Sequence, residues 1–262
     1  MQTKIEGLLL SKTEFQERHL ICSILLRTGK TISVLFYGGQ GGGKKKKPSH
    51  LELGTMLKVE LSVSKSNADV YRAKEWKLIW RPENIRNNYR AFTLLCFIVE
   101  ITAKIAGEEN LHEPSYTDEH AGIFSVVSNA AFYLEKSVEA NEFELYKELT
   151  IFLGKILGEQ GVFPRLENCS LCEEALNPRL VSALSLEHGG FICSVCSPTS
   201  GDSVVSNELW QVLSSIGSLK YQDLESLKVQ NKGISRQLLD YLLYQFQIEA
   251  RTFKSLSMVF QL

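Results

Sequence analysis

Hydrophobic residues in the N-terminal part of the chain occur in short runs and in strict alternation, as in β-strands. Residues 20–26 (LICSILL) and 31–37 (TISVLFY) are rich in β-branched and aromatic side chains. They flank residues 27–30 (RTGK), where the glycine favours a hairpin turn. Residues 57–63 (LKVELSV) alternate apolar with polar side chains and predict a half-buried antiparallel strand, and residues 70–78 are a further candidate. About five strands in this length are typical of a small barrel such as the OB-fold.

The hydrophobic spacing changes after Arg81-Pro82, where apolar residues begin to recur three and four positions apart. This period is that of an amphipathic helix. Ser206-Asn207-Glu208 is a predicted helix cap. The predicted helices are residues 88–105, 124–134, 142–157, 206–216 and 235–251.

Four of the six cysteines form two C-x2-C pairs, Cys169 with Cys172 and Cys193 with Cys196, separated by 20 residues. Two residues between the cysteines allow a tight turn to direct both sulfur atoms at one ion. The spacing predicts a tetrahedral zinc site closed by two such turns. Four thiolates leave no open coordination position, so the expected zinc ion is structural, with one ion per chain.

Other interpretations of these cysteines are less favoured than the zinc site. His188 lies between the two pairs and is an alternative ligand, although a place in a surface turn is the simpler expectation. A redox pair needs a single C-x-x-C motif at a helix N-terminus rather than two motifs in register. Residues 180–186 and 190–192 are expected to form a short β-ribbon between the pairs. Cys22 and Cys96 lie in apolar runs and are expected in the core.

Together these patterns predict an α+β protein in which an N-terminal OB-fold barrel precedes an α-helical domain with an inserted four-cysteine zinc finger. The predicted segments are the barrel (residues 1–80), the first part of the helical domain (81–168), the zinc finger (169–200) and the C-terminal part of the helical domain (201–262).

A glycine- and lysine-rich loop follows the second apolar run, at residues 38–48 (GGQGGGKKKKP). Gly38, Gly43 and Lys44 have the spacing of a phosphate loop. The next residue is Lys45, whereas magnesium binding requires serine or threonine, and Pro48 follows instead of a helix. An NTPase is therefore disfavoured. The better interpretation is a flexible loop whose lysines contact the phosphate backbone of nucleic acid, and the alternative is a solvated run without a partner.

The distribution of charge supports a polyanionic partner for the barrel. Residues 1–80 contain 14 Lys and Arg against 7 Asp and Glu, and the rest contains 15 against 23, for a net charge of −1. The predicted DNA-binding residues are Arg27, Lys30, Lys44, Lys45, Lys46 and Lys47. The aromatic residues Phe36, Tyr37, Tyr71 and Trp76 are candidates for base stacking, with a place in the core as the alternative for each.

Other features argue against a membrane protein and against an enzyme. The N-terminus lacks a secretory signal, and the apolar run at residues 91–99 is interrupted by Glu100. A cytosolic location is therefore expected, where paired cysteines are more often metal ligands than disulfides. The histidines are scattered among polar residues and no nucleophile elbow occurs, so a binding role without catalysis is expected.

Several segments occur in a fixed order along the chain: residues 6–10 (EGLLL) with 15–19 (FQERH), residues 27–30 with the Gly-Lys loop, residues 166–172 (LENCSLC) with 189–193 (GGFIC), and residues 251–255 (RTFKS). In this order they resemble the first strand and turn, the barrel hairpin and basic loop, the zinc finger and the final basic segment of the RecO family of bacterial recombination mediators.

The resemblance implies a nucleoid-associated cytoplasmic protein that binds single- and double-stranded DNA and anneals complementary strands. It also implies that the protein acts with RecR to load recombinase onto strands coated by single-strand-binding protein. Arg251 and Lys254 are the candidate contacts to a protein partner. The alternative function is a zinc-stabilised interaction scaffold that does not bind nucleic acid.

Overall fold

The computed structural model describes residues 2–39, 51–62, 70–109, 111, 122–197, 203–229 and 231–261. The chain forms two compact units. Unit 1 comprises Met1–Glu139 and Ser255–Leu262, and unit 2 comprises Ala140–Lys254. The segments predicted from sequence follow the change from strands to helices, whereas these units divide the chain at Glu139 and Lys254.

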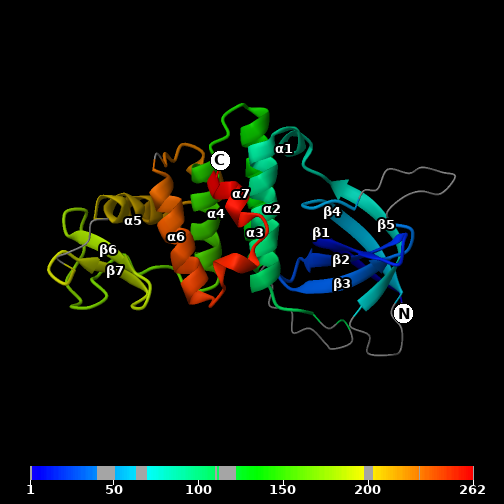
Figure 1. Ribbon diagram of the computed structural model, residues 1–262, viewed down its shortest axis with the longest axis horizontal. Coiled ribbons are helices and arrows are strands. Elements are labelled where there is room, and N and C mark those ends of the chain that lie inside the picture. The colour runs from blue at the N-terminus through cyan, green and yellow to red at the C-terminus, as the bar shows by residue number, and fades with distance from the viewer. Residues whose placement is uncertain are drawn as a thin grey trace. The chain divides into compact units, whose positions relative to one another are not determined.

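Five strands of unit 1 close into a barrel in the order β1-β2-β3-β5-β4 (Figure 1). They are β1 (Gln2–Phe15), β2 (His19–Leu26), β3 (Thr31–Phe36), β4 (Met56–Ser62) and β5 (Val70–Trp80). The long strand β1 pairs with both β2 and β4, and the register of its pairing with β2 shifts between Leu9 and Ser11. All pairs are antiparallel except β3 with β5. The predicted OB-fold barrel is confirmed.

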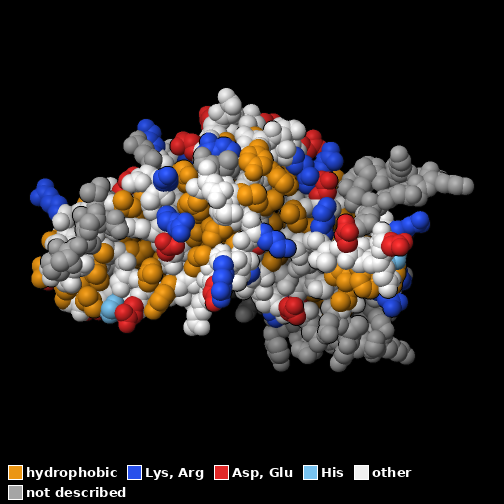
Figure 2. Space-filling view, viewed as in Figure 1, with side chains coloured by type: hydrophobic (Ala, Val, Ile, Leu, Met, Phe, Trp, Pro, Cys, Tyr) orange, Lys and Arg blue, Asp and Glu red, His pale blue; other side chains and the backbone are white. Residues whose placement is uncertain are grey.

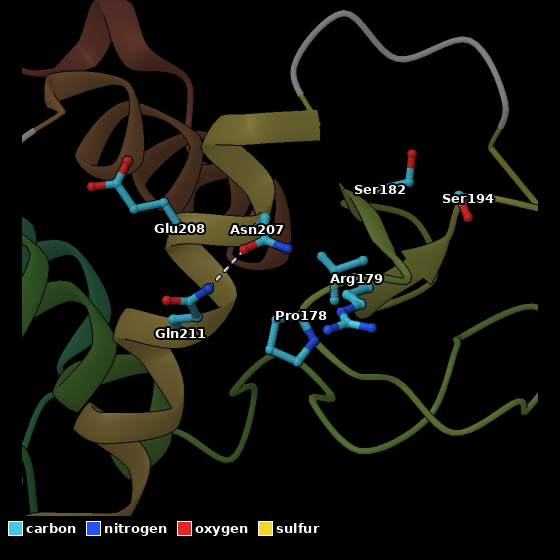
Figure 3. A pocket seen from close by; sticks show the side chains of 8 residues that line it. Pro178, Arg179, Ser182, Ser194, Asn207, Glu208 and Gln211 are labelled. Carbon is cyan, nitrogen blue, oxygen red and sulfur yellow. Dashed lines mark hydrogen bonds between the residues drawn. The ribbon is translucent and has the colours of Figure 1, made fainter.

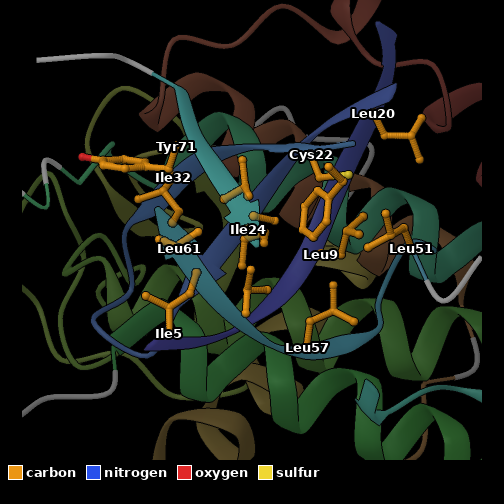
Figure 4. Packing of buried hydrophobic residues seen from close by; sticks show 14 of the residues in the cluster. Ile5, Leu9, Leu20, Cys22, Ile24, Ile32, Leu51, Leu57, Leu61 and Tyr71 are labelled. Atoms are coloured by element: carbon orange, nitrogen blue, oxygen red, sulfur yellow. The ribbon is translucent and has the colours of Figure 1, made fainter. Parts of the chain in front are cut away.

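The barrel core is built from the apolar positions of the alternating strands. Ile5, Leu9, Ile24, Leu57 and Leu61 point into one cluster (Figure 4). The intervening residues of β4 lie on the outer face, as the alternation in sequence predicts.

Four helices complete unit 1: α1 (Glu83–Asn87), α2 (Tyr89–Ile105), α3 (Gly122–Glu139) and α7 (Leu256–Gln261). Helix α2 contacts α1, α3, α7 and β1, so it forms the centre of this helical layer. Asn88 is its N-cap, and its side chain accepts a hydrogen bond from the backbone N–H of Ala91 at 3.1 Å.

Helix α1 has its N-terminus satisfied by a residue distant in sequence. Its N-cap, Pro82, makes no side-chain capping bond. The Glu135 carboxylate of α3 instead accepts the backbone N–H groups of Glu83, Asn84 and Ile85 at 2.7–3.0 Å. It also accepts the side-chain amide of Asn84 at 2.9 Å. One carboxylate thus ties α1 to α3.

Unit 2 combines helices with a β-ribbon. The helices are α4 (Leu145–Glu159), α5 (Ser203–Ser218) and α6 (Lys232–Gln245), with short 3-10 helices at Tyr221–Leu224 and Ala250–Thr252. Helix α4 packs against both α5 and α6. The predicted ribbon is confirmed as antiparallel strands β6 (Val181–Ser185) and β7 (Gly190–Cys193), joined by a turn in which Gly189 has φ +68°.

Four predicted helix boundaries in unit 2 differ from the observed ones by three residues or more, and the start of α5 and the end of α6 are the two that change the local structure. Helix α5 begins at Ser203, so Ser206 is not its cap but a buried residue whose hydroxyl donates to Gln237 at 3.3 Å. Helix α6 ends at Gln245 rather than at residue 251 because Gln247 takes a left-handed conformation, with φ +53°. Apolar residues continue to recur through this turn, so the sequence pattern does not reveal where the helix ends.

Among the residues that the structure describes, no helix is long and apolar enough to cross a membrane.

Candidate metal centre and nucleic-acid interface

The four predicted ligands come together at one end of the ribbon. Cys169, Cys172, Cys193 and Cys196 place their sulfur atoms within 4.8 Å of one another, and the Cys172 and Cys193 sulfurs are 3.7 Å apart. Metal–sulfur bonds of about 2.3 Å in a tetrahedron separate the sulfurs by about 3.8 Å. Cys169 and Cys193 are buried, whereas Cys172 is exposed. The donor set therefore fits one tetrahedral metal ion that is anchored from the core side.

Tight backbone turns create this arrangement. In the first turn the N–H of Cys169 donates to the carbonyl of Glu174 at 2.8 Å, and Glu173, at φ +61°, donates to the carbonyl of Cys169 at 3.0 Å. In the second turn the N–H of Cys196 donates to the carbonyl of Cys193 at 3.1 Å. The N–H of Cys193 also donates to the sulfur of Cys169 at 3.3 Å and links the two turns.

The surrounding backbone favours the ionised form of the Cys169 thiol. Burial raises the pKa of its thiol, but the backbone N–H groups of Cys172, Cys193 and Leu171 together outweigh burial and lower that pKa to about 6. The neighbouring side chains of Cys172 and Cys193 raise the pKa of the Cys196 thiol to about 12. The raised pKa values of the Cys172 and Cys196 thiols keep them protonated at neutral pH, so a bound cation would be needed to hold them as thiolates.

Helices α5 and α6 hold the segments that lead into the cluster. Side chains of Trp210, Tyr241 and Gln245 donate to the backbone carbonyls of Leu166, Val162 and Leu186, at 2.9, 3.2 and 2.8 Å. Gly190 fits closely against the same segments, since a Cβ atom there would lie 2.8 Å from that of Arg165. No sequence motif pointed to these supporting residues.

His188 is not a ligand. It is exposed in the β6–β7 turn, where its Nδ1 lies 2.9 Å from the hydroxyl of Ser185. The expectation of a surface turn residue is confirmed.

A hollow of about 510 Å³ lies between the ribbon and α5 (Figure 3). In it the side-chain amide of Gln211 donates to that of Asn207 at 2.8 Å. Arg179 and Ser194 approach from the ribbon side. The buried Ser182 hydroxyl donates to the Ser197 carbonyl at 2.9 Å. These side chains pair no nucleophile with a general base.

The predicted DNA contacts of the β2–β3 turn differ in their availability. Arg27 donates to Glu6 at 3.1 and 3.3 Å, and its guanidinium lies 5.4 Å from the centre of the Phe124 ring. Lys58 donates to the same carboxylate at 2.9 Å, and with Arg27 it lowers the pKa of Glu6. Lys30 is exposed and makes no ion pair within the described ranges. Arg27 is therefore partly neutralised and Lys30 is not.

The predicted contacts Lys44, Lys45, Lys46 and Lys47 lie outside the described residues. The described part of the barrel, residues 2–39, 51–62 and 70–80, holds nine Lys and Arg against six Asp and Glu. A large share of the barrel's net positive charge is therefore carried by residues outside the described ranges. On the face seen in Figure 2, side chains of both signs are interspersed.

One end of the barrel carries an exposed aromatic cluster. Tyr37, 48% exposed, meets the ring of His19 edge-on at 4.8 Å, and the Gly38 N–H donates to His19 at 3.0 Å. Phe15, 37% exposed, is paired with His19 across β1 and β2. Arg18 is exposed in the intervening turn. The cluster stands where β3 leads into the Gly-Lys loop.

The other candidate stacking residues belong to the interior. Phe36 and Tyr71 are buried, and Trp76 packs against the barrel core. Phe15 was missed in the sequence, because its proximity to Tyr37 depends on the register of β1 with β2.

Arg251 and Lys254 are both exposed in the segment after α6. Arg251 forms an ion pair with Glu249 at 2.5 Å, so part of its charge is used locally.

A family model described as Recombination protein O C terminal matches residues 86–257, about two thirds of the chain. The chain belongs to the RecO family of DNA repair proteins. The DNA repair protein RecO of Caldanaerobacter subterraneus subsp. tengcongensis is 24% identical over 249 residues, which cover 93% of this chain and 90% of that protein. The RecO of Bacillus cereus strain B4264 is 23% identical over 194 residues, covering 74% and 70%.

Among solved structures, an aspartyl-tRNA synthetase from Entamoeba histolytica aligns with 71% of this chain and 39% of its own, at 7% identity and a TM-score of 0.24. A similarity this low carries no argument. The RecO family match spans both cysteine pairs, so the metal centre lies within the matched region.

Proposed function

We propose that this member of the RecO family is a recombination mediator without catalytic activity. It binds single- and double-stranded DNA, anneals complementary strands and, with RecR, assists recombinase loading onto strands coated by single-strand-binding protein. The observation that carries DNA binding is the exposed cluster of Phe15, His19 and Tyr37 beside the Gly-Lys loop. Exposed aromatic rings next to cations are what single-stranded nucleic acid requires of a binding surface.

The placement of charge supports phosphate contacts that do not depend on sequence. Strands β2 and β3, the usual oligonucleotide-binding strands of OB-folds, carry no charged side chain between Leu20 and Phe36 except in their turn. Contacts to phosphates therefore fall on loop cations such as Arg18, Lys30 and Lys44–Lys47. Neutralising the backbone while leaving most base edges free permits two complementary strands to meet.

The contacts with RecR and with single-strand-binding protein rest on family membership. Exposure of Arg251 and Lys254 supports a role for this segment in holding an acidic partner.

Replacing Lys44–Lys47 together with alanine is expected to weaken binding of single-stranded DNA and to reduce its dependence on salt. Each phosphate contact contributes about 0.7 to the slope of log K against log salt, so the slope should fall by up to about 3. Fluorescence anisotropy across a salt series measures the slope.

Tyr37→Ala removes a stacking contact, so affinity should fall with little change in the salt slope. Tyr89→Ala, at another exposed tyrosine, serves as the control. Wild-type protein that binds no oligonucleotide at low salt would favour the scaffold function instead.

The metal is proposed to be zinc, because four cysteine sulfurs with tetrahedral spacing suit this ion and leave no position for a substrate. Elemental analysis of purified protein should give about one zinc per chain. A metal-free protein with unit 2 fully folded would contradict this assignment.

A further inference from the structure

Unit 1 contains a pocket of about 250 Å³ between the barrel and α3, lined by Leu8, Met56, Trp80, Ser128, Asn129 and Phe132. The three barrel residues form one cross-strand row, since Met56 pairs with Leu8 of β1 and with Trp80 of β5. The other three lie on α3 and form the facing wall, with Ser128 and Asn129 adjacent and Phe132 one turn further along. Neither the zinc site nor the aromatic cluster uses this pocket.

The walls combine flat aromatic surface with unused polar groups. Phe132 is 49% exposed and Trp80 is partly exposed. The Asn129 amide and the Trp80 indole N–H make no hydrogen bond to any residue that the structure describes, whereas the Ser128 hydroxyl already donates to the Ser125 carbonyl at 3.2 Å. An amide supplies both donors and an acceptor. Aromatic walls with a free amide match a nucleobase, which has two apolar faces and a polar edge.

Positive charge lies one step away on the same outer face of the barrel. The adjacent cross-strand row is Glu6, Lys58 and Lys77. Glu6 and Lys58 lie two positions along their strands from Leu8 and Met56, and same-face residues at this separation are about 7 Å apart. Lys77 lies three positions from Trp80, across a register shift of β5 against β4. Arg27 joins this row through its bonds to Glu6, so Arg27 and Lys58 both contact one carboxylate, and Lys77 adds a further positive charge opposite Lys58. A phosphate attached to a base in the pocket would meet this row.

We infer that the pocket binds one unstacked nucleobase of single-stranded DNA, with the Asn129 amide at the base edge and Lys58 and Lys77 at the phosphate. The inference rests on the proposed DNA binding and adds a second contact region, separate from the loop end of the barrel. An apolar side chain of a protein partner would fill the aromatic walls but would have no use for the lysine row. The charge therefore favours the nucleotide.

The test compares Phe132→Ala with wild-type protein for binding to a thymidine homopolymer and to an abasic homopolymer of equal length at low salt. Loss of one stacking surface should weaken binding to the thymidine strand about tenfold and leave the abasic strand unaffected. Tyr244→Ala removes an aromatic ring of similar exposure, 51%, outside the pocket and should change neither affinity. Lys58→Ala with Lys77→Ala should weaken binding to both strands.

Asn129→Leu is a second, independent test of the pocket, because it removes the amide while keeping a side chain of similar volume. It should reduce discrimination among the four homopolymers more than it reduces mean affinity. Circular dichroism verifies that each variant is folded.

Unchanged binding of the thymidine strand by folded Phe132→Ala, or equal losses for both strands, would overturn the pocket while DNA binding stands. In the first case a partner's apolar side chain becomes the better occupant. Wild-type protein that binds neither strand would overturn both the pocket and the proposed function.

Discussion

Cys193→Ser is expected to abolish tight metal binding and to unfold the ribbon of unit 2. Cys193 ends β7, is 3% exposed, and its N–H also supports the Cys169 sulfur. Serine is a poor ligand for a soft metal site, and binding of structural zinc contributes on the order of 10 kcal/mol to folding. Elemental analysis together with thermal unfolding measures the loss.

Cys22→Ser is the matched control, because Cys22 is a buried cysteine in the barrel whose thiol pKa is raised by burial to about 12. It should retain the metal and lose only about 1–2 kcal/mol of stability, from burying a hydroxyl. A Cys193→Ser protein that still holds a full equivalent of metal would refute the four-sulfur site.

Glu135→Ala is expected to destabilise unit 1 by about 3 kcal/mol, because three backbone N–H groups of α1 and the Asn84 amide lose their shared charged acceptor. Pro82 offers no side-chain replacement. Urea unfolding followed by fluorescence in a Trp210→Phe background measures it, since the remaining tryptophans, Trp76 and Trp80, both belong to unit 1.

Glu139→Ala, at the exposed end of the same helix, should change stability by less than about 0.5 kcal/mol. Glu135→Gln should be intermediate, since an amide oxygen still accepts hydrogen bonds but carries no charge. A cost for Glu135→Ala no greater than that of Glu139→Ala would show that water satisfies α1 equally well.

The features predicted correctly from sequence are those with a short period or a fixed spacing. Alternation in β4 indicated which face of the strand is buried, and the two cysteine pairs indicated one metal site. Both signals are local, because each knuckle and each strand face is defined within a few residues.

The features that were missed depend on contacts between distant residues. The aromatic cluster and the nucleobase pocket arise from strand register, which places Phe15 beside His19 and Leu8 beside Met56. Glu135 caps helix α1, which lies about fifty residues earlier in the chain, and no local sequence pattern indicates this contact. The end of α6 was missed because a left-handed Gln247 interrupts the helix without glycine or proline.

The division of unit 1 into two stretches of chain has a consequence for biosynthesis. Ser255, just before α7, donates both its N–H and its hydroxyl to Glu100 of α2, at 3.0 and 2.5 Å. Helix α7 then packs on α2. A ribosome therefore makes all of unit 2 before it releases the last piece of unit 1. Domains generally fold in N- to C-terminal order during synthesis. Here unit 2 is complete in sequence before unit 1, because unit 1 still lacks α7. Until α7 is made, one side of α2 stays uncovered.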